Sequence, residues 1–334
     1  MRKNIATAVY GTLQKLRVFS KLAETEYRRK QLLILCYHGV SAYDEHLWRP
    51  DLYISPDKFR ARLSSLKSAH ANVLPLGEAL TRLKSNSLPP RSVAITFDDG
   101  FVDFGSQAAP ALLSYGYPAT VYLTTHYSSY RYPVSNLMLD YLLWKSGQPR
   151  LAFPEFGIGD PVSIATAQQR ILVSQQITRW AASQDLSTQA RDEMLHRLAE
   201  RLGIDYQRIR DQRLLQILSG DEISRLAAQG FDFELHTHRH RIPNTEASFE
   251  REIEDNRNRI LEFTGARPKH FCYPSGRHTP EIVRWLARCG VVSAVTCDSG
   301  LARPESNPFL LPRVLDHHNL STPRFQAFVA GFSF

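Results

Sequence analysis

Two short segments, far apart in the sequence, most constrain what this 334-residue chain can fold into. The first is an apolar run at residues 93–97, followed by Asp98-Asp99-Gly100. The second is an apolar run at residues 231–235, followed by His-Thr-His-Arg-His at residues 236–240. An apolar run that ends in turn residues is typical of a buried strand opening into a loop. Both segments therefore predict polar side chains at the end of a buried strand.

The polar residues of these segments have the chemistry of a metal site. One carboxylate with the imidazoles of His236 and His240 makes a three-ligand set for a divalent cation, with positions left for water and substrate. The other carboxylate of the pair Asp98 and Asp99 is then free to act as a general base. Taken singly, Asp-Asp-Gly is most often a turn, and alternating histidines can be the solvent face of a strand. Their joint position after apolar runs favours a metal-dependent hydrolase.

The order of the segments predicts an α/β barrel. Strand and helix patterns alternate, which implies parallel strands, and polar side chains follow several strands, as in a barrel active site. The alternation stops between about residues 130 and 220, where helical patterns at 165–183 and 188–202 predict an insertion. Strands are expected at 32–37, 72–75, 93–97, 120–124, 231–235, 270–273, 291–296 and 310–313, and helices at 56–67 (capped by Ser55), 76–84, 110–115, from 221, 249–263 and 280–288.

The net charge of +8 is concentrated in an N-terminal arm. Residues 1–30 hold eight basic and two acidic residues, so the arm accounts for +6 of that charge. A nearly neutral remainder argues against a phosphate-binding face, and no nucleic-acid partner is expected.

Apolar residues of the arm recur at helical spacing. This predicts a basic amphipathic helix at residues 1–30, which either lies on an anionic membrane surface or packs its apolar stripe on the barrel. The apolar stretch is too short to span a bilayer, and no convincing cleavage site follows it. The stripe comprises Ile5, Val9, Leu13, Leu16, Phe19, Ala23 and Tyr27.

The four cysteines show no Cys-x-x-Cys pair, so free thiols in a reducing compartment are expected. We therefore predict a cytoplasmic protein, with peripheral contact to the inner membrane through residues 1–30 as one alternative for the arm.

The motifs also resemble those of a known family. Thr96-Phe97-Asp98-Asp99-Gly100 and the histidine segment at 236–240 look like the first two motifs of the polysaccharide deacetylases, the NodB-homology group of metal-dependent carbohydrate esterases. The segment Leu35-Cys36-Tyr37-His38 resembles the Tyr-His strand that opens one branch, and the Tyr-Pro-Ser-Gly segment at 273–276 resembles its third motif. The resemblance spans roughly residues 31–315 and implies a distorted (β/α)7-type barrel, the NodB-homology fold, over residues 31–334.

Position by position, the resemblance implies metal ligands at Asp99, His236 and His240 and a catalytic base at Asp98. His238, which stands between the two histidine ligands, is not expected to bind the metal.

The resemblance to the branch with a Tyr-His opening strand implies two further roles. His38 matches a general acid that protonates the departing amine, and Arg313 matches an arginine that fixes the base carboxylate. The alternatives are a polar residue that closes a strand and a surface arginine, respectively. His317 and His318 are competing acids, but they lie beyond the end of a strand.

The third motif departs from the common form of the family. Cys272 and Ser275 stand where an arginine and an aromatic residue are usual, which puts the aromatic wall of a sugar pocket in doubt. Backbone N–H groups near Tyr273 and Ser275 are candidates for supporting an oxyanion.

The sequence thus predicts a hydrolase that removes N-acetyl groups from an amino sugar in a polysaccharide, oligosaccharide or glycolipid. Zn²⁺ suits the ligand types, with Co²⁺, Ni²⁺ or Fe²⁺ as alternatives. A non-catalytic glycan-binding barrel and an O-deacylase or amidohydrolase for another acyl group are the rival functions.

Overall fold

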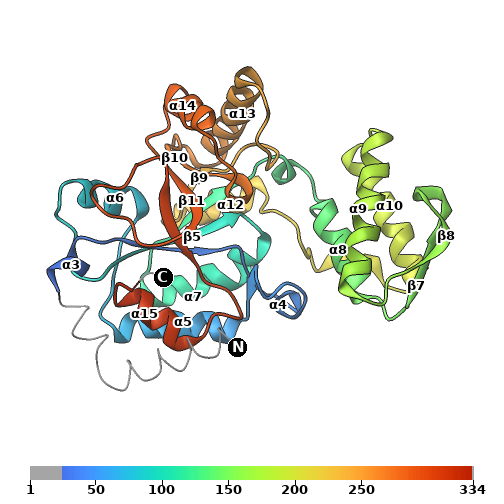
Figure 1. Cartoon of the computed structure of the whole chain (residues 1–334), viewed down its shortest axis with the longest axis horizontal. Coiled ribbons are helices and arrows are strands. Elements are labelled where there is room, and N and C mark those ends of the chain that lie inside the picture. Colours follow the sequence, from blue (N-terminus) through green and yellow to red (C-terminus); the bar gives the residue numbers. More distant parts are fainter. Residues whose placement is uncertain (1–24, 333–334) are drawn as a thin grey trace. The chain divides into compact units, whose positions relative to one another are not determined.

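The computed structural model describes residues 25–332, and the chain divides into two compact units. The barrel unit comprises the residues up to His126 together with those from Gly220 onward, and the helical unit comprises Tyr127–Ser219. Figure 1 shows the elements of both units.

Within the described residues of the barrel unit, seven parallel strands close into a ring, which confirms the predicted (β/α)7-type barrel. A short extra strand, β4 (Asn72–Val73), pairs with the beginning of β5. The ring runs β1 (Leu33–Tyr37), β12 (Leu311–Leu315), β11 (Ser293–Ser299), β10 (His270–Cys272), β9 (Asp232–Leu235), β6 (Thr120–Leu123) and β5 (Ser92–Asp99), and β5 pairs again with β1.

The register of the strands brings their carboxyl ends to one end of the barrel. Tyr37 of β1 lies opposite Phe97 of β5, and Asp99 of β5 lies opposite Leu123 of β6. Leu123 in turn lies opposite Leu235 of β9. The residues that follow these strands therefore surround the same opening, where barrel active sites are found.

Helices follow most strands and cover them with their apolar sides. Ser55 precedes the first long helix but makes no side-chain capping bond, so Pro56, with its fixed φ, marks the helix start. The helix predicted at residues 249–263 begins at Glu246, three residues before its predicted start. The helices are α3 (Glu26–Arg29), α4 (Glu45–Trp48), α5 (Pro56–Ser68), α6 (Leu76–Lys84), α7 (Ala109–Tyr115), α12 (Gly220–Ala228), α13 (Glu246–Thr264), α14 (Pro280–Arg288) and α15 (Thr322–Val329).

The helical unit contains the two long helices predicted within it, and a hairpin that the sequence did not predict. The hairpin pairs β7 (Arg150–Phe153) with β8 (Ile158–Ser163) in antiparallel fashion. Its second strand reads Ile-Gly-Asp-Pro-Val-Ser, which lacks the apolar alternation by which strands are recognised. The helices are α8 (Ser135–Lys145), α9 (Ala167–Ser183), α10 (Thr188–Leu202) and α11 (Tyr206–Asp211).

At the end of the predicted arm, the burial of Tyr27 and Arg28 differs from the amphipathic pattern. Arg28 is buried and donates hydrogen bonds to the carbonyl oxygens of Gln31, Val329 and Ser92 at 2.7, 3.1 and 3.2 Å. Tyr27, predicted to lie on the apolar stripe, is 53% exposed. The amphipathic pattern is therefore wrong for these two residues, because the barrel offers the guanidinium three carbonyl partners. The predictions for residues 1–24 lie outside the described residues. Among residues 25–332, no helix is long and apolar enough to span a bilayer.

Candidate active site

The end of β5 presents two consecutive carboxylates to the barrel opening. Side chains normally alternate between the faces of a strand, but Asp99 adopts a left-handed backbone with φ of 67°, which breaks that alternation. Gly100 follows with φ of 83° and donates its N–H to the Asp98 carbonyl oxygen at 2.8 Å. The turn lets Asp98 Oδ2 lie 4.0 Å from His38 Nε2 while Asp99 Oδ1 lies 3.3 Å from His236 Nε2.

Asp99, His236 and His240 converge on one point. The Nε2 atoms of both histidines lie 3.3 Å from Asp99 Oδ1, and one donor atom from each residue falls within 4.8 Å of the others. Donors bound at about 2.0–2.2 Å to one small cation lie roughly 3–3.5 Å apart in tetrahedral or octahedral geometry. The geometry and chemistry of the three side chains therefore fit a single divalent cation.

The electrostatics of the site also favour a cation. Burial lowers the pKa of His236, but the carboxylates of Asp99 and Asp98 outweigh burial and raise it. Burial raises the pKa of Asp99, yet the imidazoles of His240 and His236 outweigh this and lower it to about 2. His236 Nδ1 lies 2.8 Å from the Cys272 carbonyl oxygen, an arrangement that leaves Nε2 to face Asp99.

A second group of donors, Asp98, His236 and Cys272, is also close enough to share an ion. The position of Arg313 argues against an ion bound by this second group. The guanidinium binds Asp98 through two bonds of 2.7 and 2.8 Å and donates to the Cys272 sulfur at 3.1 Å. A cation placed there would face a fixed positive charge, whereas among residues 25–332 no arginine or lysine pairs with Asp99 of the triad.

Asp98 is buried and held in one orientation. Arg313, itself buried, is fixed by Thr96 Oγ1 at 3.2 Å and the Thr296 carbonyl oxygen at 3.0 Å. Burial alone would raise the pKa of Asp98, but the charge and hydrogen bonds of Arg313 hold it well below its usual range. The sequence alternative of a surface arginine is thus contradicted, since Arg313 is 2% exposed.

His38 stands beside this carboxylate, directly after β1. Its side chain is 18% exposed, and its buried Nδ1 has no hydrogen-bond partner among the described residues. Asp103 accepts the N–H of Val40 at 3.1 Å and so fixes the chain just after His38. Burial, with the nearby charge of Glu45, raises the pKa of Asp103 well above its usual value.

Tyr273 and Ser275 are the residues predicted to support an oxyanion. The N–H of Tyr273 donates to the Val295 carbonyl oxygen at 3.4 Å and its hydroxyl to the Phe309 carbonyl oxygen at 3.0 Å. Ser275 lies in a short 3₁₀ turn, Pro274–Gly276, with φ of 56°. The oxyanion role of Tyr273 and Ser275 stays a prediction.

His238 and His318 have partners outside the donor triad. His238 Nδ1 lies 2.9 Å from Thr125 Oγ1, away from the donor triad. His318 Nδ1 accepts the N–H of Ser55 at 3.4 Å, and its ring lies 4.9 Å from that of His46.

Sequence reasoning missed the residues that support the histidine loop. Glu252 and Asn256 on α13 are both buried and both bond to the loop of residues 236–241. Their signal was present in the sequence. They share the buried side of the helix with Phe249 and Ile253, where polar residues are unexpected.

A family profile for polysaccharide deacetylases matches residues 85–146 and 176–294, just over half of the chain. The chain belongs to the polysaccharide deacetylase family. The matched segments contain Asp98, Asp99, His236 and His240, and the part left out between them includes the hairpin of the helical unit. No curated protein matches the chain.

Solved structures share the fold of this polysaccharide deacetylase. The deacetylase PplD of Streptococcus pyogenes, solved in complex with acetate, has a TM-score of 0.60 at 18% identity, covering 90% of this chain and 98% of that chain. IcaB from Ammonifex degensii has a TM-score of 0.57 at 18% identity, with coverage of 90% and 98%. A de-N-acetylase from Aggregatibacter actinomycetemcomitans has a TM-score of 0.55 at 13% identity, with coverage of 89% and 99%.

Proposed function

We propose that this polysaccharide deacetylase is a metal-dependent hydrolase that removes N-acetyl groups from an amino sugar in a polysaccharide, oligosaccharide or glycolipid. The observation that carries the proposal is the convergence of Asp99, His236 and His240 beside a carboxylate, Asp98, that is clamped by Arg313. The two groups together supply a cation site and a base within one opening. The structural relatives described as deacetylases are consistent with this activity.

Asp99, His236 and His240 would hold the cation, most suitably Zn²⁺, with Co²⁺, Ni²⁺ or Fe²⁺ as alternatives. When bound, it would supply an electrophile that acidifies water and polarises the acyl carbonyl.

Asp98 accepts the proton of the attacking water. Arg313 keeps the carboxylate ionised and uses one acceptor position on each oxygen, at 2.7 and 2.8 Å, so further lone pairs remain. Because Arg313 is itself fixed by Thr96 and Thr296, the base needs no reorientation during the reaction.

His38 supplies the proton that the leaving amine requires. As the water oxygen bonds to the acyl carbon and the carbon–nitrogen bond breaks, the nitrogen takes a proton from His38, giving acetate and a free amine. The 4.0 Å between His38 Nε2 and Asp98 Oδ2 lets the proton taken up by Asp98 return to His38 with little movement.

The direct test is acetate release from N-acetylglucosamine oligomers and from lipid-linked amino sugars. We expect activity to vanish with chelator and to return with added Zn²⁺. Asp98→Asn should lower kcat by about 10²–10⁴-fold while leaving the metal bound. Full activity after complete metal removal would contradict the proposal. Retained biological function in Asp98→Asn would favour the non-catalytic glycan-binding barrel, and preference for O-acyl or other acyl substrates would favour the rival hydrolases.

The role of His38 has its own test. We expect His38→Gln to lower kcat on N-acetyl substrates by about 10²–10⁴-fold, and to spare hydrolysis of 4-nitrophenyl acetate, whose leaving group needs no proton. His70→Asn is the control, since His70 is exposed and its φ of 51° is one that asparagine tolerates. Equal losses on the amide and the activated ester would assign His38 a structural role instead.

A further inference from the structure

The loop of residues 236–241 carries both histidines of the donor triad, and a side chain of α13 ties its start to β6. Asn256 is completely buried, and its Oδ1 accepts the N–H of His236 at 2.9 Å. Its Nδ2 donates to the Leu123 carbonyl oxygen at 2.9 Å and to Thr125 Oγ1 at 3.0 Å. One amide group therefore joins the ends of β6 and β9 at the point where the loop begins.

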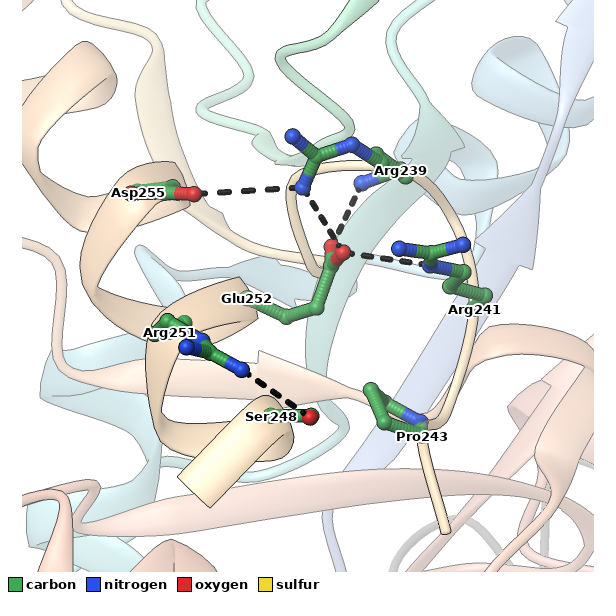
Figure 2. A pocket seen from close by; sticks show the side chains of 7 residues that line it. All are labelled: Arg239, Arg241, Pro243, Ser248, Arg251, Glu252 and Asp255. Atoms are coloured by element: carbon green, nitrogen blue, oxygen red, sulfur yellow. Dashed lines mark hydrogen bonds and ion pairs between the residues drawn. The ribbon is translucent and has the colours of Figure 1, made fainter. Parts of the chain in front are cut away.

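Glu252, one helical turn earlier, holds the rest of the loop. Its Oε2 accepts the N–H of Arg239 at 2.8 Å, and its Oε1 accepts Arg239 Nη1 at 2.9 Å and Arg241 Nε at 3.2 Å. Its carbonyl oxygen also accepts the N–H of His238 at 3.2 Å. Figure 2 shows the carboxylate between the two arginines, beside Arg251 and Asp255. A buried carboxylate needs such partners, so the two arginines that flank His240 neutralise the group that holds the loop.

The backbone of the loop depends on these contacts. Thr237 has φ of 61°, a value that β-branched residues rarely adopt, and His240 also lies in the left-handed region with φ of 53°. Such conformations persist only where the surroundings impose them. The side chain of His240 is 39% exposed, and its ring lies edge-on to that of His236 at 4.8 Å, so its position depends on the backbone of the loop that carries both.

We propose that Glu252 and Asn256 are positioning residues, which keep His236 and His240 aimed at a common point and so set the affinity for the metal. This inference rests on the proposed metal site at Asp99, His236 and His240. Neither residue belongs to the donor triad, and both are proposed to act through the loop.

The test is a zinc titration of the folded, full-length chain against a chromophoric chelator. Glu252→Gln places an amide N–H₂ group against the N–H donors of Arg239. Asn256→Asp removes the N–H₂ group that donates to the Leu123 carbonyl oxygen and to Thr125 Oγ1. We expect each variant to bind Zn²⁺ about 10–100-fold more weakly. Glu250→Gln and Asn258→Asp make the same chemical changes at exposed positions of the same helix and should bind as the wild type does.

A purely structural role predicts a different result. Urea unfolding of the metal-free variants would then show lost stability, while the folded fraction would bind Zn²⁺ with unchanged affinity, and that outcome would overturn the inference. If neither buried variant folds, Arg241→Gln decides, because this side chain is 64% exposed. Weaker zinc binding supports the inference, and unchanged binding overturns it.

Asp99→Asn in the same titration separates this inference from the proposed function. If it leaves zinc affinity unchanged, the proposed metal site itself is wrong. If it abolishes binding while the α13 variants bind normally, only the positioning role fails.

Discussion

At the scale of single residues, the charge state of Asp98 depends on a balance between burial and Arg313. Burial favours the neutral acid, and the two thiols of Cys36 and Cys272 approach Oδ2 at 3.6 and 3.4 Å as weak donors. Arg313 brings a full positive charge into contact with the carboxylate, and the pKa of Asp98 is accordingly depressed. A depressed carboxyl pKa adds stability that is present above the unfolded-state pKa and is lost as pH falls through the folded-state pKa.

Arg313→Gln is expected to leave Asp98 buried without a countercharge. We predict that the free energy of unfolding at neutral pH falls by about 3–5 kcal/mol, because a buried pair is broken from one side. The pKa of Asp98 should rise, so the acidic limb of kcat/KM moves to higher pH. Urea unfolding and a pH–rate profile measure the two effects.

Arg284→Gln is the matched control for this substitution. Arg284 pairs with Glu281 on α14 but is 62% exposed, so its loss should change stability by about 0.5 kcal/mol or less. An acidic limb that does not move in Arg313→Gln would show that another group controls the charge of Asp98.

At the scale of elements, the turn that ends β5 is tightly constrained. A Cβ on Gly100 would lie 2.4 Å from Leu123 Cδ1, and the φ of 83° disfavours any side chain. We predict that Gly100→Ala lowers stability by about 2–3 kcal/mol and weakens metal binding, because the overlap pushes Asp99 out of place. Thermal unfolding and zinc titration measure both.

Gly147→Ala is the comparison for that variant, since no atom lies within 4 Å of the added Cβ and its φ is unexceptional. Its stability should match that of the wild type. A Gly100→Ala variant that behaves like Gly147→Ala would mean that Leu123 yields without disturbing β5.

The same turn shows what sequence patterns can and cannot predict. The apolar run predicted β5 only to Phe97, but the strand extends through Asp99 because Asp98 and Asp99 pair with Tyr122 and Leu123 of β6, a long-range contact. By contrast, α14 was predicted to the residue, since its cap at Thr279 and its first proline are local signals. The two histidines of the donor triad were suggested by their spacing, and the choice of Asp99 was implied by the resemblance to the family's motifs. The support of the triad by Glu252 was not predicted, although Glu252 lies at helical spacing with the apolar residues Phe249 and Ile253 on the buried side of α13.

Membrane contact through the N-terminal arm remains a proposal. Because Arg28 is buried in the barrel unit, the test should remove only the residues before Thr25. A cytoplasmic protein with peripheral membrane contact would use the basic residues before Thr25, namely Arg2, Lys3, Lys15, Arg17 and Lys21. Each is worth up to about 1 kcal/mol near an anionic surface. We predict that the full chain floats with anionic liposomes and that a chain beginning at Thr25, which keeps the buried Arg28, does not. Equal flotation of the two would exclude the arm as the anchor.

At the scale of the whole molecule, the chain has two compact units, each with its own core. The helical unit buries its own apolar residues, among them Leu142, Ile177 and Leu198. The donor triad and the base come entirely from the barrel unit. Ligand binding therefore stabilises one unit directly, and unfolding of the chain need not be a single transition.

This division predicts how metal changes thermal unfolding. Zinc bound to the folded barrel at 100 times its Kd adds about 2.7 kcal/mol of stability, which raises the Tm of that unit by roughly 5–10 °C. Calorimetry with Zn²⁺ and with chelator should show this shift in the barrel transition, while a separate transition of Tyr127–Ser219 stays in place. Asp99→Asn should abolish the shift, because it removes the carboxylate that lies 3.3 Å from both imidazoles. A zinc-dependent shift that survives Asp99→Asn would place the metal elsewhere in the molecule.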